Sequence, residues 1–277
     1  MTLPRKSACR LFLLLGLALA TQGAAAQSTL DRIQAKGSVA IGVMLSGPPY
    51  GTIDPNDRQP FGYNIDLARE LARRLGTTAS LVEVTPPNRV QFLQQGKVDV
   101  LIANMQWSAE RAEILDFVPT AYDETGGAPV TRRDSPIRRW EDLRGQTVCV
   151  SQGSSYAKPL TELYGAQVAG YPGMAESLLA LKGGNCVAAV HDGALVRHVV
   201  TDNPEWADYT IPIGTQIAAS PSVIWLRKGD AALRQALDAI VRNLHRSGWL
   251  VEHARQSHLA TDGFLDRLHD QALAGQL

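Results

Sequence analysis

Short apolar segments alternate with helical patterns along this chain, and that alternation restricts its fold more than any other feature. Apolar runs at 38–45, 79–84 and 98–103 have the length and composition of buried strands. Between them, residues 63–76 carry apolar side chains at helical spacing and end at a glycine, and residues 88–96 form a shorter helical pattern. This order predicts a parallel sheet flanked by helices.

The same alternation of strands and helices starts again after residue 133. Strands are predicted at 147–152, 167–171 and 186–192, separated by helical patterns at 155–165 and 174–184. This second set is a smaller strand–helix–strand series and shows no close sequence repeat of the first. The chain is therefore expected to be α/β, with two lobes.

The C-terminal part follows a different pattern. Residues 221–229 predict a strand, and residues 230–256 predict helix, because apolar side chains recur there at helical spacing. Two lobes joined around residues 124–131 and 214–222 fit this layout. In open α/β sheets ligands bind at the carboxyl ends of strands, so those ends are where we look for a site.

The first 26 residues have the layout of a secretory signal peptide. Arg5, Lys6 and Arg10 precede a ten-residue apolar run at 11–20, and three alanines end at Ala26, after which we expect cleavage. An uncleaved anchor is the alternative. Cleavage would remove three basic and no acidic residues, which leaves 24 Lys and Arg against 27 Asp and Glu, a net charge of −3. No basic patch indicates nucleic acid as a partner.

Two cysteines, Cys149 and Cys186, remain after the expected cleavage, and both lie in predicted strands. An oxidising compartment favours a disulfide if those strands are neighbours, and two buried free thiols are the alternative. We predict the disulfide, worth about 4 kcal/mol in the chain-entropy description. The histidines lack the spacing of metal ligands, so we expect neither a metal nor a cofactor.

Arg111 follows the predicted strand at 98–103. Ser108 is a plausible N-cap for the next helix, which places Arg111 in its first turn, where a cation opposes the helix dipole. Its guanidinium could reach over the strand ends and bind a carboxylate. The alternative is a surface ion pair with an acid such as Glu110 or Asp116.

Two further strand ends carry polar side chains. Gly153, Ser154 and Ser155 open a predicted helix with free N–H groups and hydroxyls that suit an anion, although such residues are also common in loops. Asp192 ends the strand at 186–192, where it could cap the next helix or hold an ammonium group. Together with Arg111, these residues suit both ends of a zwitterion.

At this point a family resemblance can be stated. The chain resembles the periplasmic solute-binding proteins of polar amino acid ABC importers, extracellular solute-binding protein family 3, over essentially its whole expected mature length. The most specific part is the run NRVQFLQQGKVDVLIANMQWSAERAEILDF. The other matching segments are PPYGTID, FGYNIDLARELARRLG, VCVSQGSSY, CVAAVHDGAL and VIWLRKGDAALRQALDAI.

The resemblance implies a two-lobed periplasmic binding protein of type II, the Venus flytrap, with two βαβ-type lobes joined by a two-strand hinge. Lobe 1 would comprise residues 27–126 and 220–277, and lobe 2 residues 127–219. It also implies a monomer in the periplasm that closes on an L-amino acid and delivers it to an ABC transporter permease.

The family's site residues can be carried over by position. Its carboxylate-binding arginine falls on Arg111, and its ammonium-binding aspartate falls on Asp192. Its first-lobe contacts fall on Asn104 and Gln106, although Gln106 stands where Ser or Thr is usual. Its Gly-Thr-Thr motif falls on the segment 153–155, in which Ser154 and Ser155 keep both hydroxyls.

The side-chain specificity is implied less directly. Met44 and Gly47 stand where binders of basic amino acids carry an acid and a stacking aromatic, which argues against a basic ligand. Arg89 resembles an arginine of the acidic-amino-acid branch, which implies glutamate or aspartate, or it is a structural partner near a helix start. Tyr50 and Trp107 either line the pocket or are core aromatics.

Two rival functions share this fold. A secreted dehydratase needs a general acid in the cleft, for which His191 and Glu124 are the nearest candidates. A ligand-sensing module would dock on a receptor in place of a permease. No nucleophile or metalloprotease motif is present in the sequence, so we expect a binding protein and not an enzyme.

Overall fold

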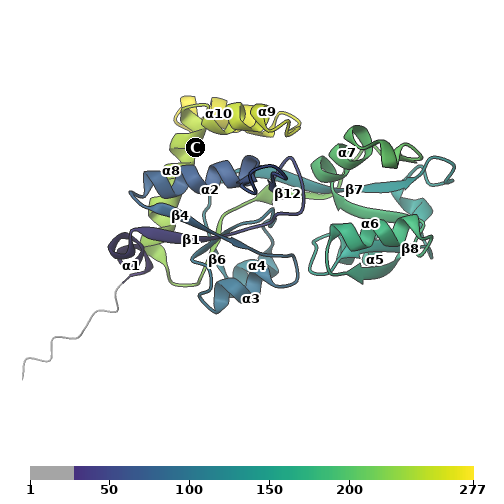
Figure 1. Cartoon of the computed structure of the whole chain (residues 1–277), viewed down its shortest axis with the longest axis horizontal. Helices are drawn as coiled ribbons and strands as arrows, with labels where there is room; N and C mark the ends of the chain where they lie inside the picture. Colours follow the sequence, from purple (N-terminus) through teal and green to yellow (C-terminus); the bar gives the residue numbers. More distant parts are fainter. Residues whose placement is uncertain (1–27) are drawn as a thin grey trace, which may run out of the picture.

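Two lobes, each built on its own β-sheet, lie side by side in the computed structural model, which describes residues 28–277 (Figure 1). The segment for which we predict a signal peptide, residues 1–26, lies outside the described residues. Within residues 28–277, no helix is both long enough and apolar enough to cross a bilayer.

The first lobe, on the left in Figure 1, has a sheet in the order β4-β1-β5-β13-β6. Strand β1 is parallel to both β4 and β5, which confirms the predicted parallel arrangement. Strand β13 pairs antiparallel with β5 and with β6. The strands are β1 Ser38–Val43, β4 Thr78–Glu83, β5 Val100–Ile102, β6 Asp116–Phe117 and β13 Trp225–Leu226, and a separate hairpin pairs β2 Thr52–Ile53 with β3 Pro60–Phe61.

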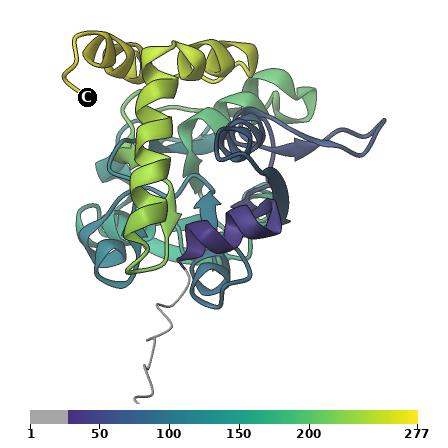
Figure 2. The ribbon, with the colours of Figure 1, turned by 90° about the vertical axis from the view of Figure 1, so that its left-hand side faces the viewer.

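Helix α2 (Tyr63–Arg74) shows how the sequence pattern forms this lobe. Ile65, Ala68 and Leu71 are buried on the face that packs against β1 and β4, while Glu70 pairs with Arg74 one turn later. Figure 2 shows the long helix α8 along the lobe, with α9 and α10 at its upper end. The helices of this lobe are α1 Thr29–Lys36, α2, α3 Arg89–Gln94, α4 Ala109–Ile114, α8 Ala231–Arg246, α9 Trp249–Gln256 and α10 Phe264–Leu273.

The second lobe has a sheet in the order β11-β7-β10-β8-β9, with β12 paired to β7. Strand β8 is parallel to β9 and β10, as predicted, and β7 is antiparallel to β10. Apolar clusters cover this sheet. Its strands are β7 Asp123–Arg132, β8 Thr147–Ser151, β9 Gln167–Tyr171, β10 Ala188–Asp192, β11 Tyr209–Thr210 and β12 Ile217–Ser222, and its helices are α5 Ala157–Glu162, α6 Met174–Lys182 and α7 Gly193–Asp202, with 3₁₀ turns η1 Trp140–Leu143 and η2 Pro204–Trp206.

Strands β7 and β12 connect the two lobes. They pair antiparallel, with Asp123 opposite Ser222 and Gly127 opposite Ile217. This agrees with the two-strand connection expected from the sequence. The predicted boundaries at 126/127 and 219/220 fall inside these two strands and remain a prediction.

The disulfide predicted in the second lobe is present. Cys149 in β8 bonds to Cys186, and their Cα atoms are 5.9 Å apart. The two cysteines can meet because β8 and β10 are adjacent parallel strands, and Cys186 lies just before β10.

The prediction of one strand over 221–229 is wrong. The chain leaves the ladder with β7 at Ser222 and enters the first sheet as β13 only at Trp225. Val223 and Ile224 between them are buried. Local hydrophobicity could not show that this short segment serves two sheets in turn.

Candidate functional site

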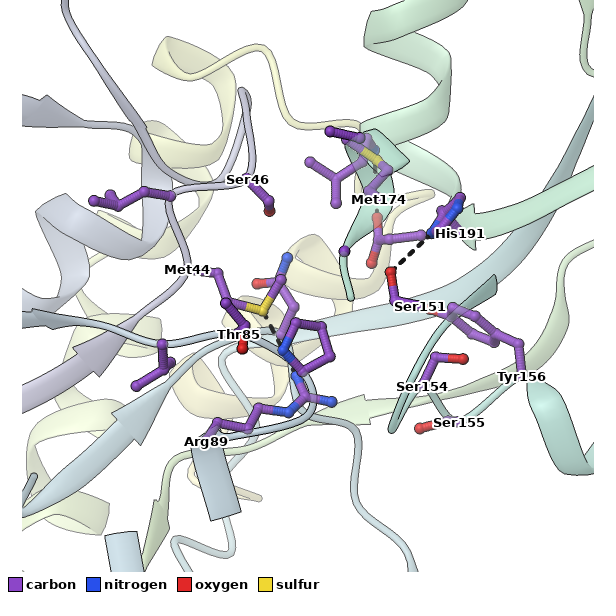
Figure 3. A pocket seen from close by; sticks show the side chains of 18 of the residues that line it. Met44, Ser46, Thr85, Arg89, Ser151, Ser154, Ser155, Tyr156, Met174 and His191 are labelled. Atoms are coloured by element: carbon purple, nitrogen blue, oxygen red, sulfur yellow. Dashed lines mark hydrogen bonds between the residues drawn. The ribbon is translucent and has the colours of Figure 1, made fainter. Parts of the chain in front are cut away.

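A cavity of about 290 Å³ lies where the strands of both lobes end. Its size is close to the lower end of the range for small-molecule pockets. Figure 3 shows that Met44, Thr85 and Arg89 approach it from the first lobe, and Ser151, Ser154, Ser155, Tyr156, Met174 and His191 from the second. The rest of its lining is Leu45, Ser46, Glu83, Val84, Pro86, Asn104, Gln106, Gly173, Ala175, Glu176, Asp192 and Leu195.

Arg111 connects the two lobes beside this cavity. Ser108 accepts a hydrogen bond from the Arg111 backbone N–H at 3.3 Å, which confirms the predicted N-cap. The guanidinium Nη1 donates to the Gln106 carbonyl at 2.9 Å and to Ser155 Oγ at 2.8 Å across the lobes. Arg111 lines an adjoining groove together with Ser154 and Ser155, and not the main cavity.

Arg89 lies at the start of α3 and is only 4% exposed. Its Nη1 donates to the Ala103 carbonyl at 2.7 Å and lies 3.7 Å from the Met44 sulfur. Burial, and then the nearby Arg111 guanidinium, lower the pKa of Arg89 to about 9. The Gly153 carbonyl accepts from Arg89 at 3.5 Å and from Arg111 at 3.4 Å, so both cations converge on one point.

Neither arginine forms an ion pair in the part of the chain that the structure describes. Within residues 28–277, no ion pair includes Arg89 or Arg111. The predicted alternative for Arg111, an ion pair with Glu110 or Asp116, is therefore not formed; Glu110 pairs with Lys158 and Asp116 with Arg234. Two guanidinium groups close together without a carboxylate create a strong preference for an anion.

Asp192 has the first of the two roles that the sequence left open, that of a helix cap, and the second, binding an ammonium group, remains a prediction. Its Oδ1 caps helix α7 by accepting from the N–H groups of Ala194 at 3.0 Å and Leu195 at 3.4 Å. Its Oδ2 is buried and has no hydrogen-bond partner among the described residues. Burial raises the pKa of this carboxyl to about 7. One oxygen therefore serves the fold, and the other is left with an unused acceptor.

The segment 153–155 brings the second lobe against the first. Gly153 has φ +73°, and a Cβ placed there would lie 2.8 Å from the Pro86 carbonyl oxygen. This close approach requires glycine. Ser154 Oγ is buried without a partner among the described residues, and it lines the cavity.

Asn104 and Gln106 both line the cavity but are held by other parts of the chain. Asn104 accepts from the Asn64 side chain, whereas its own Nδ2 is buried and has no partner among the described residues. The Gln106 amide donates to the carbonyls of Thr125 and Ala218 in the connecting segment. Gln106 thus binds the first lobe to the connection. The Ser or Thr that is usual at this position would offer a hydroxyl instead.

Tyr50 and Trp107 do not line the cavity or the adjoining groove. Tyr50 is buried, and its hydroxyl donates to Asp123 Oδ2 at 2.9 Å. Trp107 is 41% exposed and meets Phe117 edge to face. The structure brings the other seven predicted ligand residues to the cavity or to the groove beside it.

Several site residues escaped the sequence analysis. Ser151, Thr85 and Met174 line the cavity, and each lies at or just after a strand end. Extending the search to every strand end would have found them. Asp123 had no such signal, because no strand was singled out within 118–132.

His191 lies on the cavity wall as part of a buried hydrogen-bonded series. Its Nδ1 is 3.5 Å from Ser151 Oγ (Figure 3). Its Nε2 is 2.8 Å from Ser177 Oγ. Burial lowers the pKa of His191 to about 3, so its imidazole is neutral at ordinary pH. Nowhere in residues 28–277 do three or more His, Cys, Asp or Glu side chains group closely enough to hold a metal ion.

Comparison with known proteins places these features in context. The family model described as bacterial extracellular solute-binding proteins, family 3, matches residues 39–257. The glutamine-binding protein of Geobacillus stearothermophilus is 29% identical over 68% of this chain and 74% of its own length. The L-glutamate/L-aspartate-binding protein of Pseudomonas aeruginosa is 24% identical over 79% of this chain and 76% of its own length.

A solved structure of similar shape is the cysteine-binding protein of Campylobacter jejuni. Its TM-score is 0.78 at 28% sequence identity, and the match covers 86% of this chain and 97% of that one. The similarity therefore extends over both lobes and the strands that connect them.

Proposed function

The chain belongs to the bacterial extracellular solute-binding proteins, family 3, and on that premise we propose that it binds an L-amino acid between its lobes and delivers it to an ABC import permease. The observation that carries the proposal is the set of charges left unpaired around one cavity. Arg89 and Arg111 lack an acid, and Asp192 lacks a cation, within residues 28–277. After cleavage near Ala26 the protein would act as a monomer in the periplasm.

Arg111 would bind the ligand's α-carboxylate. Its guanidinium already lies at the lobe interface, where it contacts Ser155 Oγ. The buried Ser154 hydroxyl and the Asn104 amide supply further donors. Each charge-assisted hydrogen bond contributes about 1.5–3 kcal/mol net.

Asp192 would bind the ligand's ammonium group through Oδ2. That oxygen is free because Oδ1 alone caps helix α7. An ammonium group next to Asp192 would favour its ionised form and would repay the cost of burying the charge. Asp192 is therefore expected to lose its proton when the ligand binds near neutral pH.

Binding would be coupled to closure of the two lobes. Arg111 belongs to the first lobe and Asp192 to the second, so only a closed form can use both at once. Such a ligand shifts the population toward the closed form by its greater affinity for it. A few of these bonds, less the entropy of association, give micromolar affinity, about −8 kcal/mol. We assign the lobes to residues 27–126 with 220–277, and 127–219.

Glutamate and aspartate fit the charges best. Among the groups that line the cavity or the groove beside it, Arg89 and Arg111 give two positive charges and Asp192 is the buried acid, so the complement is a ligand with one ammonium and two carboxylates. Glu83 and Glu176 also line the cavity, but both are exposed, and water screens their charge. Arg89 would take the side-chain carboxylate.

A catalytic role is less well supported than binding. A neutral His191 with a pKa of about 3 cannot supply a proton as a general acid near neutral pH. Glu124 is exposed and does not line the cavity. We therefore propose that the ligand is bound and released unchanged. Trp107 is left out of the proposed contacts because it lines neither the cavity nor the groove.

A thermal-shift screen of the mature chain against the twenty amino acids tests this proposal, after unfolding and refolding to remove copurified ligand. Stabilisation should grow with ligand concentration above Kd, and calorimetry should give the affinity. Glutamate or aspartate should stabilise the wild type and Arg234→Ala, a surface control, but not Arg111→Ala. Stabilisation by none of the twenty would refute the amino acid proposal.

A further inference from the structure

Asp123 is a buried acid that has no cation beside it in the described part of the chain. It is the first residue of β7, in the connection between the lobes, and is 1% exposed. Its Oδ2 accepts from the Tyr50 hydroxyl at 2.9 Å, and its Oδ1 has no partner among residues 28–277. No described ion pair includes it. Burying such an unpaired group lowers the stability of the fold, so we looked for a function that it serves.

The Tyr50 hydroxyl lies close to both Asp123 and Asp192. The two acids each raise the pKa of Tyr50, after the larger effect of burial. Burial also has the largest effect on the pKa of Asp192 and raises it, whereas the N–H groups of Ala194 and Leu195, and then the Tyr50 hydroxyl, lower it. Burial, and next the charge of Asp192, raise the pKa of Asp123 well above its usual range. Tyr50, from the first lobe, thus stands between an acid of the connection and an acid of the second lobe.

Three more phenols and a further acid surround this cluster. Tyr63 and Tyr122, from the first lobe and the connection, are buried phenols near Asp123, and their pKa values are raised. Tyr156, at the start of α5, faces Asp192 and is buried too. Glu124 adds further negative charge next to Asp123. Arg89 and Arg111 affect Tyr156 but are not among the groups that shift the pKa of either acid.

A phenol has a single proton to donate, and here two carboxylates compete for it. Because Tyr50 donates to Asp123, Asp192 Oδ2 is left without a partner. If Asp123 could not accept, the same hydroxyl could rotate and donate to Asp192. The acceptor that faces the cavity would then be satisfied by the protein itself.

We propose that Asp123 is a positioning residue that retains the Tyr50 proton and thereby keeps Asp192 open for a protonated amine. It acts through Tyr50 and does not touch the ligand. This inference rests on the proposed function and adds to it a class of ligand. The cavity should select compounds with a protonated amine over carboxylic acids that carry a hydroxyl at the same carbon.

The test compares two ligands, L-glutamate and L-2-hydroxyglutarate, or the amino acid found in the screen and its 2-hydroxy analogue. The measured quantity is the ratio of their Kd values at one pH, by calorimetry on the full mature chain. Asp123→Ala should lower the preference for the amine by about 10-fold or more, because Tyr50 then competes for Asp192. Asp123→Asn keeps an acceptor oxygen for Tyr50 and should retain the wild-type ratio.

A double variant separates this role from a structural one. Tyr50→Phe combined with Asp123→Ala removes the competing hydroxyl as well, so the preference for the amine should return. Asp99→Ala, which alters a buried carboxylate of the first lobe, should lower the unfolding temperature and leave the ratio unchanged. The inference is overturned if Asp123→Ala keeps the wild-type ratio, or if the double variant fails to restore it. Absence of amino acid binding by the wild type would instead overturn the proposed function.

Discussion

Two regions of the molecule bury charged side chains, and they differ in whether those side chains have partners of opposite charge. In the first lobe, Asp99 accepts from Arg32 at 2.6 Å and from the Ala40 N–H at 3.0 Å, and Arg227 lies 3.6 Å away. In and beside the cavity between the lobes, Arg89 and Arg111 have no ion-pair partner and Asp192 has no cation within residues 28–277. Both regions are buried, but only in the first does the buried charge have opposite charges beside it.

The difference separates structural charges from charges kept for a ligand. A buried ion that is fully paired repays its desolvation inside the fold, whereas an unpaired one remains a cost to the folded state. Such a cost is typical of functional sites, where a local rule is broken for a binding partner. Substitutions in the two regions should therefore change different measurable quantities.

The pH dependence of folding should show the largest contrast. In the unliganded fold Asp192 keeps its proton up to about pH 7, but in the unfolded chain only up to about pH 4. Between these values the folded state binds more protons, so stability must fall as pH rises. Urea unfolding should show that Asp192→Asn, which keeps an N-cap oxygen, removes up to about 4 kcal/mol of this loss. Equal pH dependence in the two proteins would contradict the assignment.

Replacing Arg111 should have an effect nearly as large, but on ligand affinity and not on stability. Arg111→Ala is expected to raise Kd by about 100-fold or more, since truncating one partner of a charged contact costs about 2–5 kcal/mol. Its free energy of unfolding should change by less than about 1 kcal/mol, because no ion pair of the fold is lost. Titration calorimetry and urea unfolding measure the two quantities. A large loss of stability would show that Arg111, like Asp99, has a structural role.

The converse substitution tests the paired region. Asp99→Ala should lower the free energy of unfolding by about 2–3 kcal/mol, because it leaves Arg227, the Ala40 N–H and the half-exposed Arg32 without their acceptor. The Kd of the ligand should stay within the error of the wild type. Weakened binding in a variant that is still folded would show that the two regions are coupled.

The smallest effect is expected at the contact between the lobes. Gly153→Ala should raise Kd by about 10-fold, because the added Cβ meets the Pro86 carbonyl when the lobes close. Gly145→Ala is the matched control, since Gly145 has a similar φ of +71° and no atom within 4 Å of an added Cβ. Both variants carry the same backbone strain, so only the first should weaken binding beyond its effect on stability.

Much of the fold could be predicted from local pattern. The central strands and helix α2 repeat apolar residues at their own period, and their parallel order follows from strand and helix alternation. The bond between Cys149 and Cys186 followed from composition and compartment. Helix α1, the gap between β12 and β13, and the break before α9 at Gly248 were not predicted, because they depend on what the segments pack against.

The candidate site was predictable only where a residue's position alone carries the signal. Asp192 ends a strand, Ser154 and Ser155 lie in the loop after one, and Arg111 lies in the helix that follows another. Parallel strands bring their carboxyl ends to one edge of the sheet. The sequence by itself determined these types of residue and the order of elements that gathers them. Only the tertiary structure decided that the Tyr50 hydroxyl binds Asp123 and does not line the cavity, and that one Asp192 oxygen has no partner among the described residues. The physical reason is that hydrogen-bond partners and burial are set by segments far apart in the chain, whereas period and spacing are set by neighbours.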